Sequence, residues 1–307
     1  MSAKGKVHLP VGQEAIEEKG WYGAHKFLIW RRVSQAFFLI LFLLGPWFGI
    51  WWVQGNLAGS MTFGFLPLND PLILTQMMAA GHWPETTALI GGLIVLAAYA
   101  LVGGRVYCSW VCPINPVTDG AHWLHDKLNI QKGWQPKRSA RYWILGTVVV
   151  VSAVTGTIAW EIVNPVTMVH RGLVFGMGWI WGMVAAIFLF DLLVARRGWC
   201  GHVCPVGAFY SLVGIRSLLR VSAVKRSECD DCMDCYAVCP ENQVISPALR
   251  GKGEASPLIL SPDCTNCGRC IDVCAMDVFT FTNRFDTHVE APNDAARVTE
   301  PSNRHAA

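Results

Sequence analysis

Eight cysteines near the C-terminus form two runs with the same spacing. The runs are Cys229-x2-Cys232-x2-Cys235-x3-Cys239 and Cys264-x2-Cys267-x2-Cys270-x3-Cys274. In the bacterial form of this spacing, three thiolates of a run surround one [4Fe–4S] cluster and the fourth binds the other cluster. We therefore predict two clusters with crossed ligands. The first set is Cys229, Cys232, Cys235 and Cys274, and the second is Cys264, Cys267, Cys270 and Cys239.

Two other readings of this spacing fit less well. A disulfide framework is disfavoured because cysteines so close in the chain suit bridge geometry poorly. A zinc ribbon would show two C-x2-C pairs rather than two runs of four. The second run departs slightly from the usual pattern, since Ala275 stands where proline often follows the last cysteine. The long stretch between Cys239 and Cys264 predicts an inserted loop.

The composition indicates a membrane protein with a soluble tail. Of 307 residues, 52% are hydrophobic and only 15% are charged, which is too apolar for a purely soluble protein. The net charge of +3 is small, and no basic run with interleaved aromatic residues predicts a nucleic-acid site. Residues 1–26 are polar and do not resemble a signal peptide. The stretches long enough to cross a bilayer, which takes about 20 residues, are 33–53, 87–104, 142–160 and 173–195.

The charges of the connecting segments alternate along the chain. Residues 1–32 hold six lysines and arginines, residues 54–86 hold none, residues 105–141 hold six, and residues 161–172 hold only Arg171. By the positive-inside rule, both termini and the two cysteine runs lie in the cytoplasm, where iron–sulfur chemistry is expected and stable disulfides are not. The tryptophans expected to form an aromatic belt at the outer boundary are Trp47, Trp51, Trp52, Trp160 and Trp179.

Four further cysteines lie in two copies of one pattern, Arg-x-aromatic-Cys-x-x-Val-Cys-Pro. The copies occupy residues 105–113 and 197–205, after the second and fourth apolar stretches. Upstream, Asp-Pro at 70–71 and Asn-Pro at 164–165 occupy equivalent outer loops. These features predict two parallel helix-pair repeats related by a pseudo-twofold axis along the membrane normal. Such an axis would bring together Cys108, Cys112, Cys200 and Cys204 at the cytoplasmic face.

The chemistry of these four CxxxCP thiols stays open at this point. One interpretation is a further iron–sulfur cluster or metal that relays electrons between the membrane and the ferredoxin domain. Another is a pair of redox-active dithiols. A third is structural, because small buried cysteines also pack at helix ends. The matching flanks of the two copies favour a chemical role, but C-x3-C is looser than the C-x2-C of most cluster loops and does not choose between cluster and dithiol.

Motifs that are absent narrow the electron carriers. The chain has no C-x-x-C-H, no histidine inside a predicted span, no G-x-G-x-x-G after a strand and no Walker A motif. The carriers are therefore iron–sulfur centres and thiols, and the natural membrane-soluble partner is a quinone. A quinol site needs a proton acceptor near the headgroup layer. The candidates are His82, Glu161, His170 and Arg171 on the outer side and His122, His125, Asp126 and Asp191 on the inner side. For each, a solvated loop or boundary residue is the favoured reading.

The resulting organisation has seven segments. An amphipathic helix on the inner leaflet is predicted over 208–224, because Arg216 and Arg220 lie one turn apart in an apolar stretch. The segments are a cytoplasmic N-terminus (1–32), transmembrane repeat 1 (33–113), a cytoplasmic loop (114–141), transmembrane repeat 2 (142–205), an amphipathic linker (206–226), the ferredoxin domain (227–284) and a polar tail (285–307).

With these features, the chain resembles the NapH family, the membrane ferredoxin-type subunits of periplasmic nitrate reductase systems. The resemblance covers nearly the whole chain and is carried by the strings at 45–49 (GPWFG), 107–113 (YCSWVCP), 199–207 (WCGHVCPVG) and 232–235 (CMDC). It implies a quinol dehydrogenase component of the bacterial inner membrane. Such a subunit passes electrons, with a periplasmic iron–sulfur partner, toward nitrate reductase. Related chains with this plan serve nitrous oxide reduction and oxidase assembly, and the quoted strings favour the nitrate branch.

Three hypotheses follow. The first is an α-helical integral membrane subunit with four transmembrane helices and a C-terminal 2×[4Fe–4S] ferredoxin domain, which takes electrons from quinol. Its relay would be Cys108, Cys112, Cys200 and Cys204. The second is a maturation or redox-maintenance factor that reduces a metal or thiol in a partner enzyme and needs no quinol site. The third, a membrane anchor with structural clusters, is disfavoured because the paired spacing suits intercluster transfer. The sequence does not explain how electrons from cytoplasmic clusters reach a periplasmic acceptor.

Overall fold

The computed structural model describes residues 10–128, 130, 137–176, 178–251 and 256–290. The chain divides into two compact units. The helical unit comprises residues 28–219 and 261–267, and the ferredoxin unit comprises residues 1–27, 220–260 and 268–307 as far as they are described. The predicted polar tail lies outside the described residues from 291 onward.

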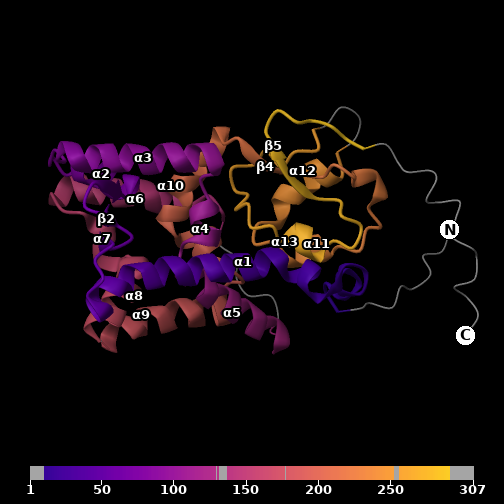
Figure 1. Ribbon diagram of the computed structural model, residues 1–307, viewed down its shortest axis with the longest axis horizontal. Coiled ribbons are helices and arrows are strands. Elements are labelled where there is room, and N and C mark those ends of the chain that lie inside the picture. Colours follow the sequence, from indigo (N-terminus) through magenta and orange to yellow (C-terminus); the bar gives the residue numbers. More distant parts are fainter. Residues whose placement is uncertain (1–9, 129, 131–136, 177, 252–255, 291–307) are drawn as a thin grey trace, which may run out of the picture. The chain divides into compact units, whose positions relative to one another are not determined.

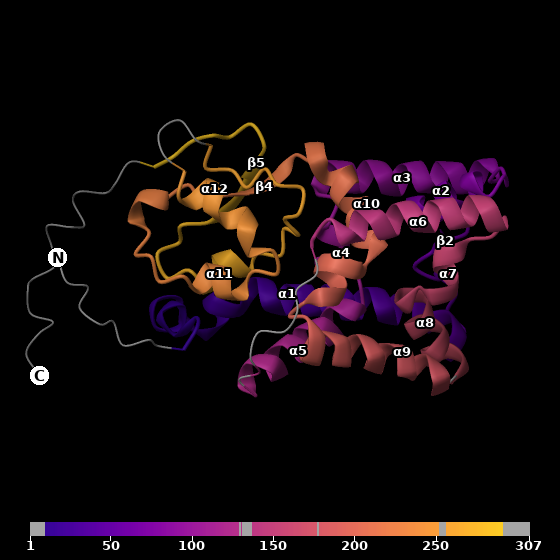
Figure 2. The same cartoon turned by 180° about the vertical axis from the view of Figure 1, so that it is seen from behind.

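The axes of four apolar helices lie nearly parallel in the helical unit (Figures 1 and 2). They are α1 (Gln13–Phe48, from Leu28 on), α3 (Thr86–Val102), α6 (Ala140–Thr155) and α9 (Gly178–Leu189), which continues as the π-helical turn η1 (Phe190–Val194). In the described part of the chain, only α1 is by itself long and apolar enough to cross a membrane, and the other three are shorter apolar helices. The four crossing helices therefore stay a prediction.

The helix boundaries correct three of the predicted spans. The span predicted over 33–53 is too long, since α1 ends at Phe48 and Val53 begins a strand. The span over 142–160 ends early, because Gly156 adopts the left-handed conformation (φ 66°) that closes α6. Gly176 does the same (φ 66°) and divides the span over 173–195. Hydropathy alone does not detect these breaks, because they arise from the backbone.

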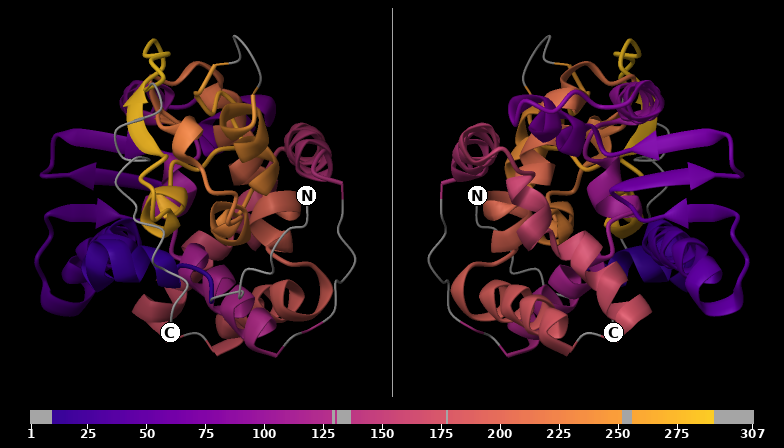
Figure 3. Two further views of the ribbon diagram at one scale, coloured as in Figure 1. Left: turned by 90° about the vertical axis from the view of Figure 1, so that its right-hand side faces the viewer. Right: turned by 90° about the vertical axis from the view of Figure 1, so that its left-hand side faces the viewer.

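The segments predicted as outer loops are folded. An antiparallel sheet with the order β1-β2-β3 is visible in Figure 3. Its strands are β1 (Val53–Gly55), β2 (Gly59–Thr62) and β3 (Leu66–Asn69), and the helices of these segments are α2 (Pro71–Ala79), α7 (Ala159–Val163) and α8 (Pro165–Phe175). Helices α2 and α8 begin in the same way. Asp70 Oδ1 accepts a hydrogen bond from Leu72 N at 2.9 Å, and Asn164 Oδ1 accepts one from Val166 N at 3.1 Å, each as an N-cap followed by proline.

The surface of the helical unit is largely apolar along its long helices. Large apolar side chains are exposed on all four long helices, among them Phe37, Ile40, Leu93, Leu101, Val150, Val154, Trp181 and Leu189. Polar and charged side chains are buried between the elements, among them Arg31, Gln35, Arg105, Arg141, Ser152 and Asp191. An apolar surface of this extent is expected to face lipid or a partner rather than water. Trp160 differs from the predicted belt, because it is only 4% exposed and packs in the core.

Shorter elements follow the long helices. They are α4 (Val106–Trp110), α5 (Ile114–Lys127), the π-helical turn η2 (Trp199–Val203), α10 (Pro205–Val213), η3 (Gly214–Arg216) and β4 (Leu219–Ser222). The amphipathic helix predicted over 208–224 is therefore wrong beyond Val213. Arg220 lies in strand β4 and is 2% exposed, so it does not face a membrane surface.

The ferredoxin unit combines short helices with a two-stranded sheet, β4-β5. Its other elements are η4 (Arg226–Glu228), α11 (Asp234–Val238), η5 (Asn242–Val244), α12 (Ile245–Leu249), α13 (Arg269–Val273) and β5 (Thr280–Asn283). The beginning of α1 belongs to this unit. Gly12 N donates to Asp234 Oδ2 at 2.8 Å, and Phe27 N donates to Asp272 Oδ1 at 3.0 Å. The N-terminal segment predicted to stand apart is thus partly built into the ferredoxin unit.

Candidate iron–sulfur site and thiol cluster

The four cysteines of the first predicted ligand set converge on one pocket of the ferredoxin unit. Cys229, Cys232, Cys235 and Cys274 all line it, together with apolar residues such as Leu249. The fourth cysteine of this pocket therefore comes from the second run, as the predicted crossed ligand pattern requires.

The spacing of the sulfurs fits a cluster better than a single metal ion. A zinc ion, with Zn–S bonds of about 2.3 Å, would draw its sulfurs to within about 4 Å of one another. No three cysteine sulfurs among the described residues lie within 4.8 Å of one another. A four-iron cube holds its cysteines at separate corners and suits the wider arrangement.

The backbone of the two runs explains how each loop surrounds a cluster. The residues on either side of the second cysteine have positive φ in both runs. They are Asp231 (61°) and Met233 (69°) in the first run and Asn266 (46°) and Gly268 (72°) in the second. The third cysteine is then the second residue of a short helix, α11 or α13, which ends before the fourth cysteine. Alternating left- and right-handed residues curl the chain around a small object and turn backbone N–H groups inward.

Burial and mutual repulsion keep the pocket thiols protonated when no cation is bound. Burial raises the pKa of Cys235 to about 12, and the charges of Cys274, Cys232 and Cys229 raise it as well. Burial likewise raises the pKa of Cys232 to about 11. Metal ligands must be thiolates. Cluster assembly here therefore has to release protons and supply the positive charge that stabilises four adjacent thiolates.

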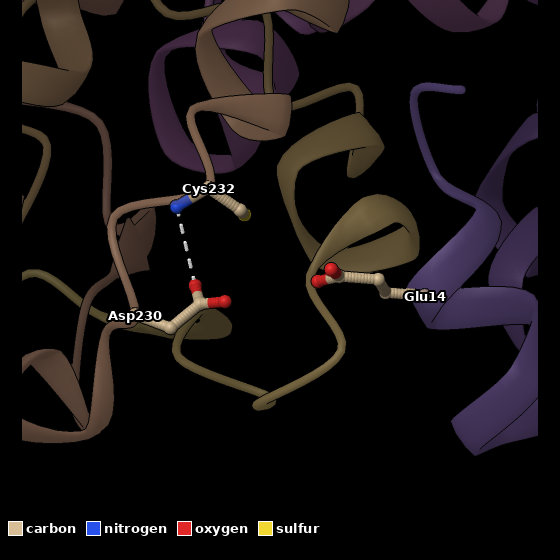
Figure 4. Close-up of side chains that lie close together, drawn as sticks. All are labelled: Glu14, Asp230 and Cys232. Atoms are coloured by element: carbon tan, nitrogen blue, oxygen red, sulfur yellow. Dashed lines mark hydrogen bonds between the residues drawn. The ribbon is translucent and has the colours of Figure 1, made fainter. Parts of the chain in front are cut away.

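Two carboxylates lie beside one of these cysteines. Glu14, Asp230 and Cys232 bring one ligand atom each to within 4.8 Å of one another (Figure 4). Asp230 Oδ1 accepts a hydrogen bond from Cys232 N at 3.3 Å, which fixes the loop rather than a metal. Acidic groups next to the site, one partly buried and one exposed, add negative charge, which opposes reduction of a cluster and lowers its potential.

The second predicted ligand set is divided between the two units. Cys264 and Cys267 belong to the helical unit, whereas Cys239 and Cys270 belong to the ferredoxin unit. This set stays a prediction of the sequence.

The two CxxxCP copies converge within the helical unit. In each copy the N–H of the second cysteine donates to the carbonyl of the aromatic residue five positions earlier. Cys112 N donates to Tyr107 O at 3.0 Å, and Cys204 N donates to Trp199 O at 2.9 Å. This wide turn is of the π type that is frequent at functional sites. Because residues four apart share a helix face, it places both thiols of a copy on one side.

The four thiols are close enough to influence one another. Burial raises the pKa of Cys204 to about 11, and the charge of Cys108 raises it further. The pKa of Cys112 is raised by burial and then by Cys108 and Cys204. Burial also raises the pKa of Cys200, to which Cys204, Cys112 and Cys108 contribute. The predicted meeting of the two loops is therefore present, and the arrangement suits either dithiol chemistry or a bound metal centre.

The outer quinol candidates differ in their surroundings. His170 is 9% exposed, its ring lies edge-on to Phe42 with centroids 6.3 Å apart, and its Nε2 has no hydrogen-bond partner among the described residues. Burial lowers the pKa of His170. Glu161 instead pairs with Arg171 at 3.6 Å, and His82 is exposed. Among the four outer candidates, His170 is therefore a neutral base, and its Nε2 has no hydrogen-bond partner among the described residues.

The inner candidates are already engaged with one another or with the backbone. Arg196 donates to His122 Nδ1 at 3.3 Å and lies 3.5 Å from Asp126, which is also 3.7 Å from His125 Nδ1. Asp191 is fully buried, and its Oδ1 accepts from Trp199 N at 2.8 Å, so it caps the turn that carries Cys200. His122, His125 and Asp126 thus belong to an ion-pair cluster with Arg196. Asp191 has a structural role, because it caps the turn of the second CxxxCP copy.

Sequence reasoning missed the arginines of the thiol site. Arg105 and Arg141 are 2% and 0% exposed and act on the Cys108 thiol, where Arg105 also forms a hydrogen bond. The signal for Arg105 was present, because arginine opens both copies of the CxxxCP pattern. Arg141 carries no such signal, because it lies outside the repeated pattern and is only one of the six basic residues of 105–141.

Comparisons with known proteins bear on both sites. A family model described as "4Fe-4S dicluster domain" matches residues 228–286, and one described as "4Fe-4S binding domain" matches residues 85–131 and 175–222, which contain the two CxxxCP copies. No solved structure matches the chain significantly.

Relatives match almost the whole chain. It is 50% identical to the ferredoxin-type protein NapH of Haemophilus influenzae over 275 residues, 90% of this chain and 96% of the relative. It is 48% identical to NapH of Escherichia coli, over the same shares. It is 49% identical to the methylamine utilization ferredoxin-type protein MauN of Methylorubrum extorquens, over 88% of this chain and 94% of the relative.

Proposed function

Because the chain belongs to the family of ferredoxin-type proteins named NapH and MauN, we propose that it oxidises quinol in the bacterial inner membrane and passes the electrons toward a periplasmic nitrate reductase. Its role as an iron–sulfur electron-transfer protein follows from the family and from the two matched 4Fe-4S models. The observation that carries the proposal is the convergence of Cys229, Cys232, Cys235 and Cys274 on one pocket. One quinol releases two electrons and two protons, which matches two one-electron clusters.

The membrane part of the proposal is supported by the apolar surface of the helical unit. Helices α3 and α6 have 17 and 16 residues, or about 25 Å at 1.5 Å per residue, and a hydrocarbon core is about 30 Å thick. Their exposed apolar and buried polar side chains suit lipid contact. We accordingly propose four crossing helices with both termini in the cytoplasm.

We propose His170 as the proton acceptor of the quinol site. It is buried beside Phe42 and has an unpaired ring nitrogen among the described residues. A neutral imidazole with a lowered pKa is able to accept a hydrogen bond from a quinol hydroxyl and then its proton. The periplasmic acceptor is proposed to be a partner iron–sulfur subunit of the nitrate reductase system. Cys108, Cys112, Cys200 and Cys204 are the proposed relay between clusters and membrane.

The test uses the full chain, purified without oxygen in detergent. Dithionite should produce the EPR signal of reduced [4Fe–4S] clusters, and excess quinol should produce the same signal. His170→Gln should slow the quinol reaction at least about tenfold, which corresponds to about 1.4 kcal/mol of barrier, and leave the dithionite signal intact. His82→Gln is the matched control, because His82 is an exposed outer histidine. Clusters that dithionite reduces and quinol does not would contradict the proposal.

A second candidate is a redox maturation factor for a metalloenzyme. It is favoured by the four converging thiols, which need no quinol to act on a partner's metal or thiol. A relative named for methylamine utilization is about as similar to this chain as the relatives named NapH, which also favours a plan that serves more than one system. Transient binding to an apo-enzyme, measured against stable stoichiometric association with a reductase, distinguishes the two functions.

A further inference from the structure

The loop that carries Cys264 and Cys267 is held by side chains of the first CxxxCP copy. Within the helical unit, Ser109 Oγ donates a hydrogen bond of 2.7 Å to Thr265 O, and Trp110 Nε1 donates one of 3.1 Å to Asn266 O. Thr265 and Asn266 are the two residues between Cys264 and Cys267, and Ser109 and Trp110 lie between Cys108 and Cys112. Each bond therefore joins the interior of one cysteine loop to the interior of the other.

A buried arginine adds a third connection. Arg105 Nη1 donates to Asp263 O at 2.8 Å, and its Nη2 donates to Cys200 O at 3.2 Å. The same guanidinium hydrogen-bonds the Cys108 thiol. One cation thus contacts both CxxxCP copies and the residue preceding Cys264. At 2% exposure it is poorly screened by solvent.

Other contacts fix the loop in place. The carboxylate of Asp263 is paired with the buried guanidinium of Arg141, whose Nη1 also donates to Gly201 O at 3.3 Å. Asn266 Nδ2 donates to Leu219 O at 3.1 Å. Loop 261–267 is therefore anchored at both ends and in its middle.

The second CxxxCP copy does not offer the same side chains. Gly201 and His202 occupy the positions of Ser109 and Trp110. Gly201 has no side chain, and in the contacts described above the second copy serves the loop and its arginines through the backbone carbonyls of Cys200 and Gly201. The repeat is thus asymmetric at the residues that hold the loop.

Resting on the electron-transfer function proposed above, we propose that the first CxxxCP loop couples the four thiols to the cluster bound through Cys264 and Cys267. Arg105, Ser109 and Trp110 are its positioning residues. The hydrogen-bonded bridges fix the separation of the two centres. The buried charge of Arg105 favours the reduced form of that cluster and raises its potential, because hydrogen bonds and nearby charge set cluster potentials.

The test is a mediated redox titration of the full chain in detergent, followed by EPR. Arg105→Gln should lower one of the two midpoint potentials and leave the other unchanged. The expected change is about tenfold in the reduced-to-oxidised ratio at fixed potential, or about 59 mV for a one-electron centre. Ser109→Ala and Trp110→Phe should change the EPR line shape of the same cluster. Arg197→Gln, the equivalent arginine of the second copy, is the matched control and should move neither potential.

Iron content guards against a purely structural explanation. Ser152→Ala removes another buried serine hydroxyl of the helical unit, 0% exposed against 1% for Ser109, and should keep all the iron. Full iron content in Ser109→Ala and Trp110→Phe, together with the changed EPR line shape, would support the proposal. Loss of all the iron, unchanged potentials in Arg105→Gln, or an equal shift in Arg197→Gln would overturn it. Since the titration uses chemical mediators, it reports the coupling even if quinol does not react with the chain.

Discussion

The two CxxxCP copies follow one backbone plan but surround their first thiols differently. When Cys108 is aligned with Cys200, Tyr99 of the first copy takes the position of Asp191 in the second. Arg105 hydrogen-bonds the Cys108 thiol, whereas the carboxylate of Asp191 has the largest charge effect on the Cys200 thiol. A cation stabilises a thiolate and a carboxylate opposes one, so the two copies hold thiols of different character.

The two copies also differ in the helices that follow them, α5 after the first copy and α10 after the second. Thr118 Oγ1 lies 3.8 Å from Cys200 Sγ. The equivalent position in the second copy is Tyr210, which stacks on Tyr107 with ring centroids 5.1 Å apart. Equivalent positions of the two copies therefore hold a hydroxyl beside Cys200 and an aromatic ring stacked on Tyr107. The shared backbone thus determines where the thiols lie, and the diverged side chains determine what each pair does.

Replacing single thiols tests this contrast most strongly. Cys108→Ser should reduce the rate of quinol-dependent cluster reduction at least about tenfold, equivalent to about 1.4 kcal/mol, because serine cannot carry electrons or form a disulfide. Cys200→Ser should have a smaller effect. Stopped-flow absorbance of the clusters measures both rates. Full turnover in both variants would show that the thiols are not a relay, and equal losses would remove the distinction between the copies.

Among the changes that affect stability, breaking the ion pair between Arg141 and Asp263 of loop 261–267 should have the largest effect. Arg141→Met leaves the carboxylate of Asp263 without its buried partner, at a cost of about 3 kcal/mol in unfolding free energy. The control is Arg171→Met, since Arg171 is 49% exposed and 3.6 Å from Glu161, and an exposed pair contributes less than about 1 kcal/mol. Thermal unfolding in detergent compares the two. Similar shifts in both variants would contradict the expectation.

The N-caps of α2 and α8, Asp70 and Asn164, allow the two predicted outer segments to be compared by exchanging one residue type for the other. Asn164→Asp should destabilise the fold by about 2 kcal/mol, because Asn164 Nδ2 donates to Glu161 at 3.1 Å and a buried carboxylate would repel that group instead. Asp70→Asn should stabilise it at neutral pH by about 1–3 kcal/mol. Burial raises the pKa of Asp70 from 3.8 to about 6.

The pH dependence of the Asp70→Asn variant has a definite sign. A pKa raised in the folded state makes the folded protein more stable at low pH and less stable as the pH rises through about 6. The advantage of asparagine should therefore be absent near pH 4, grow between pH 4 and 6, and stay constant above pH 7. Melting temperatures across this range check it, and a gain that is independent of pH would show that the carboxylate is not the cause.

The two cysteine runs of the ferredoxin pattern can be compared at equivalent positions, Met233 and Gly268, where smaller effects on stability are expected. A Cβ at Gly268 would lie 2.5 Å from the Phe27 ring, and its φ is 72°, so Gly268→Ala should cost about 1–2 kcal/mol. Met233 adopts the same conformation with φ 69°. Met233→Gly should therefore change stability by less than about 1 kcal/mol, since relief of strain offsets lost contacts. Denaturation of the cluster-loaded chain measures both, and equal costs would contradict this account.

The sequence by itself determined the features that depend on local spacing. The cysteine spacing predicted the first ligand set, which the structure brings together around one pocket. The repeated pattern predicted that the loops of Cys108 and Cys204 meet, and the Asp-Pro and Asn-Pro pairs begin equivalent helices. Helix α3 begins within one residue of the predicted position. Such features follow from the chain geometry of a few neighbouring residues.

Only the tertiary structure decided the remaining features. It placed the loop of Cys264 in the helical unit, built residues 13–27 into the ferredoxin unit and buried Trp160. It also buried Arg141, one of the six basic residues of 105–141, as the partner of Asp263. These outcomes depend on contacts between distant residues: Arg141 and Asp263 are 122 positions apart, and Trp160 N donates to Gln76 Oε1 84 positions away. A buried charge is stable only where a distant segment supplies its counter-charge or hydrogen bonds, and spacing within one segment carries no information about that partner.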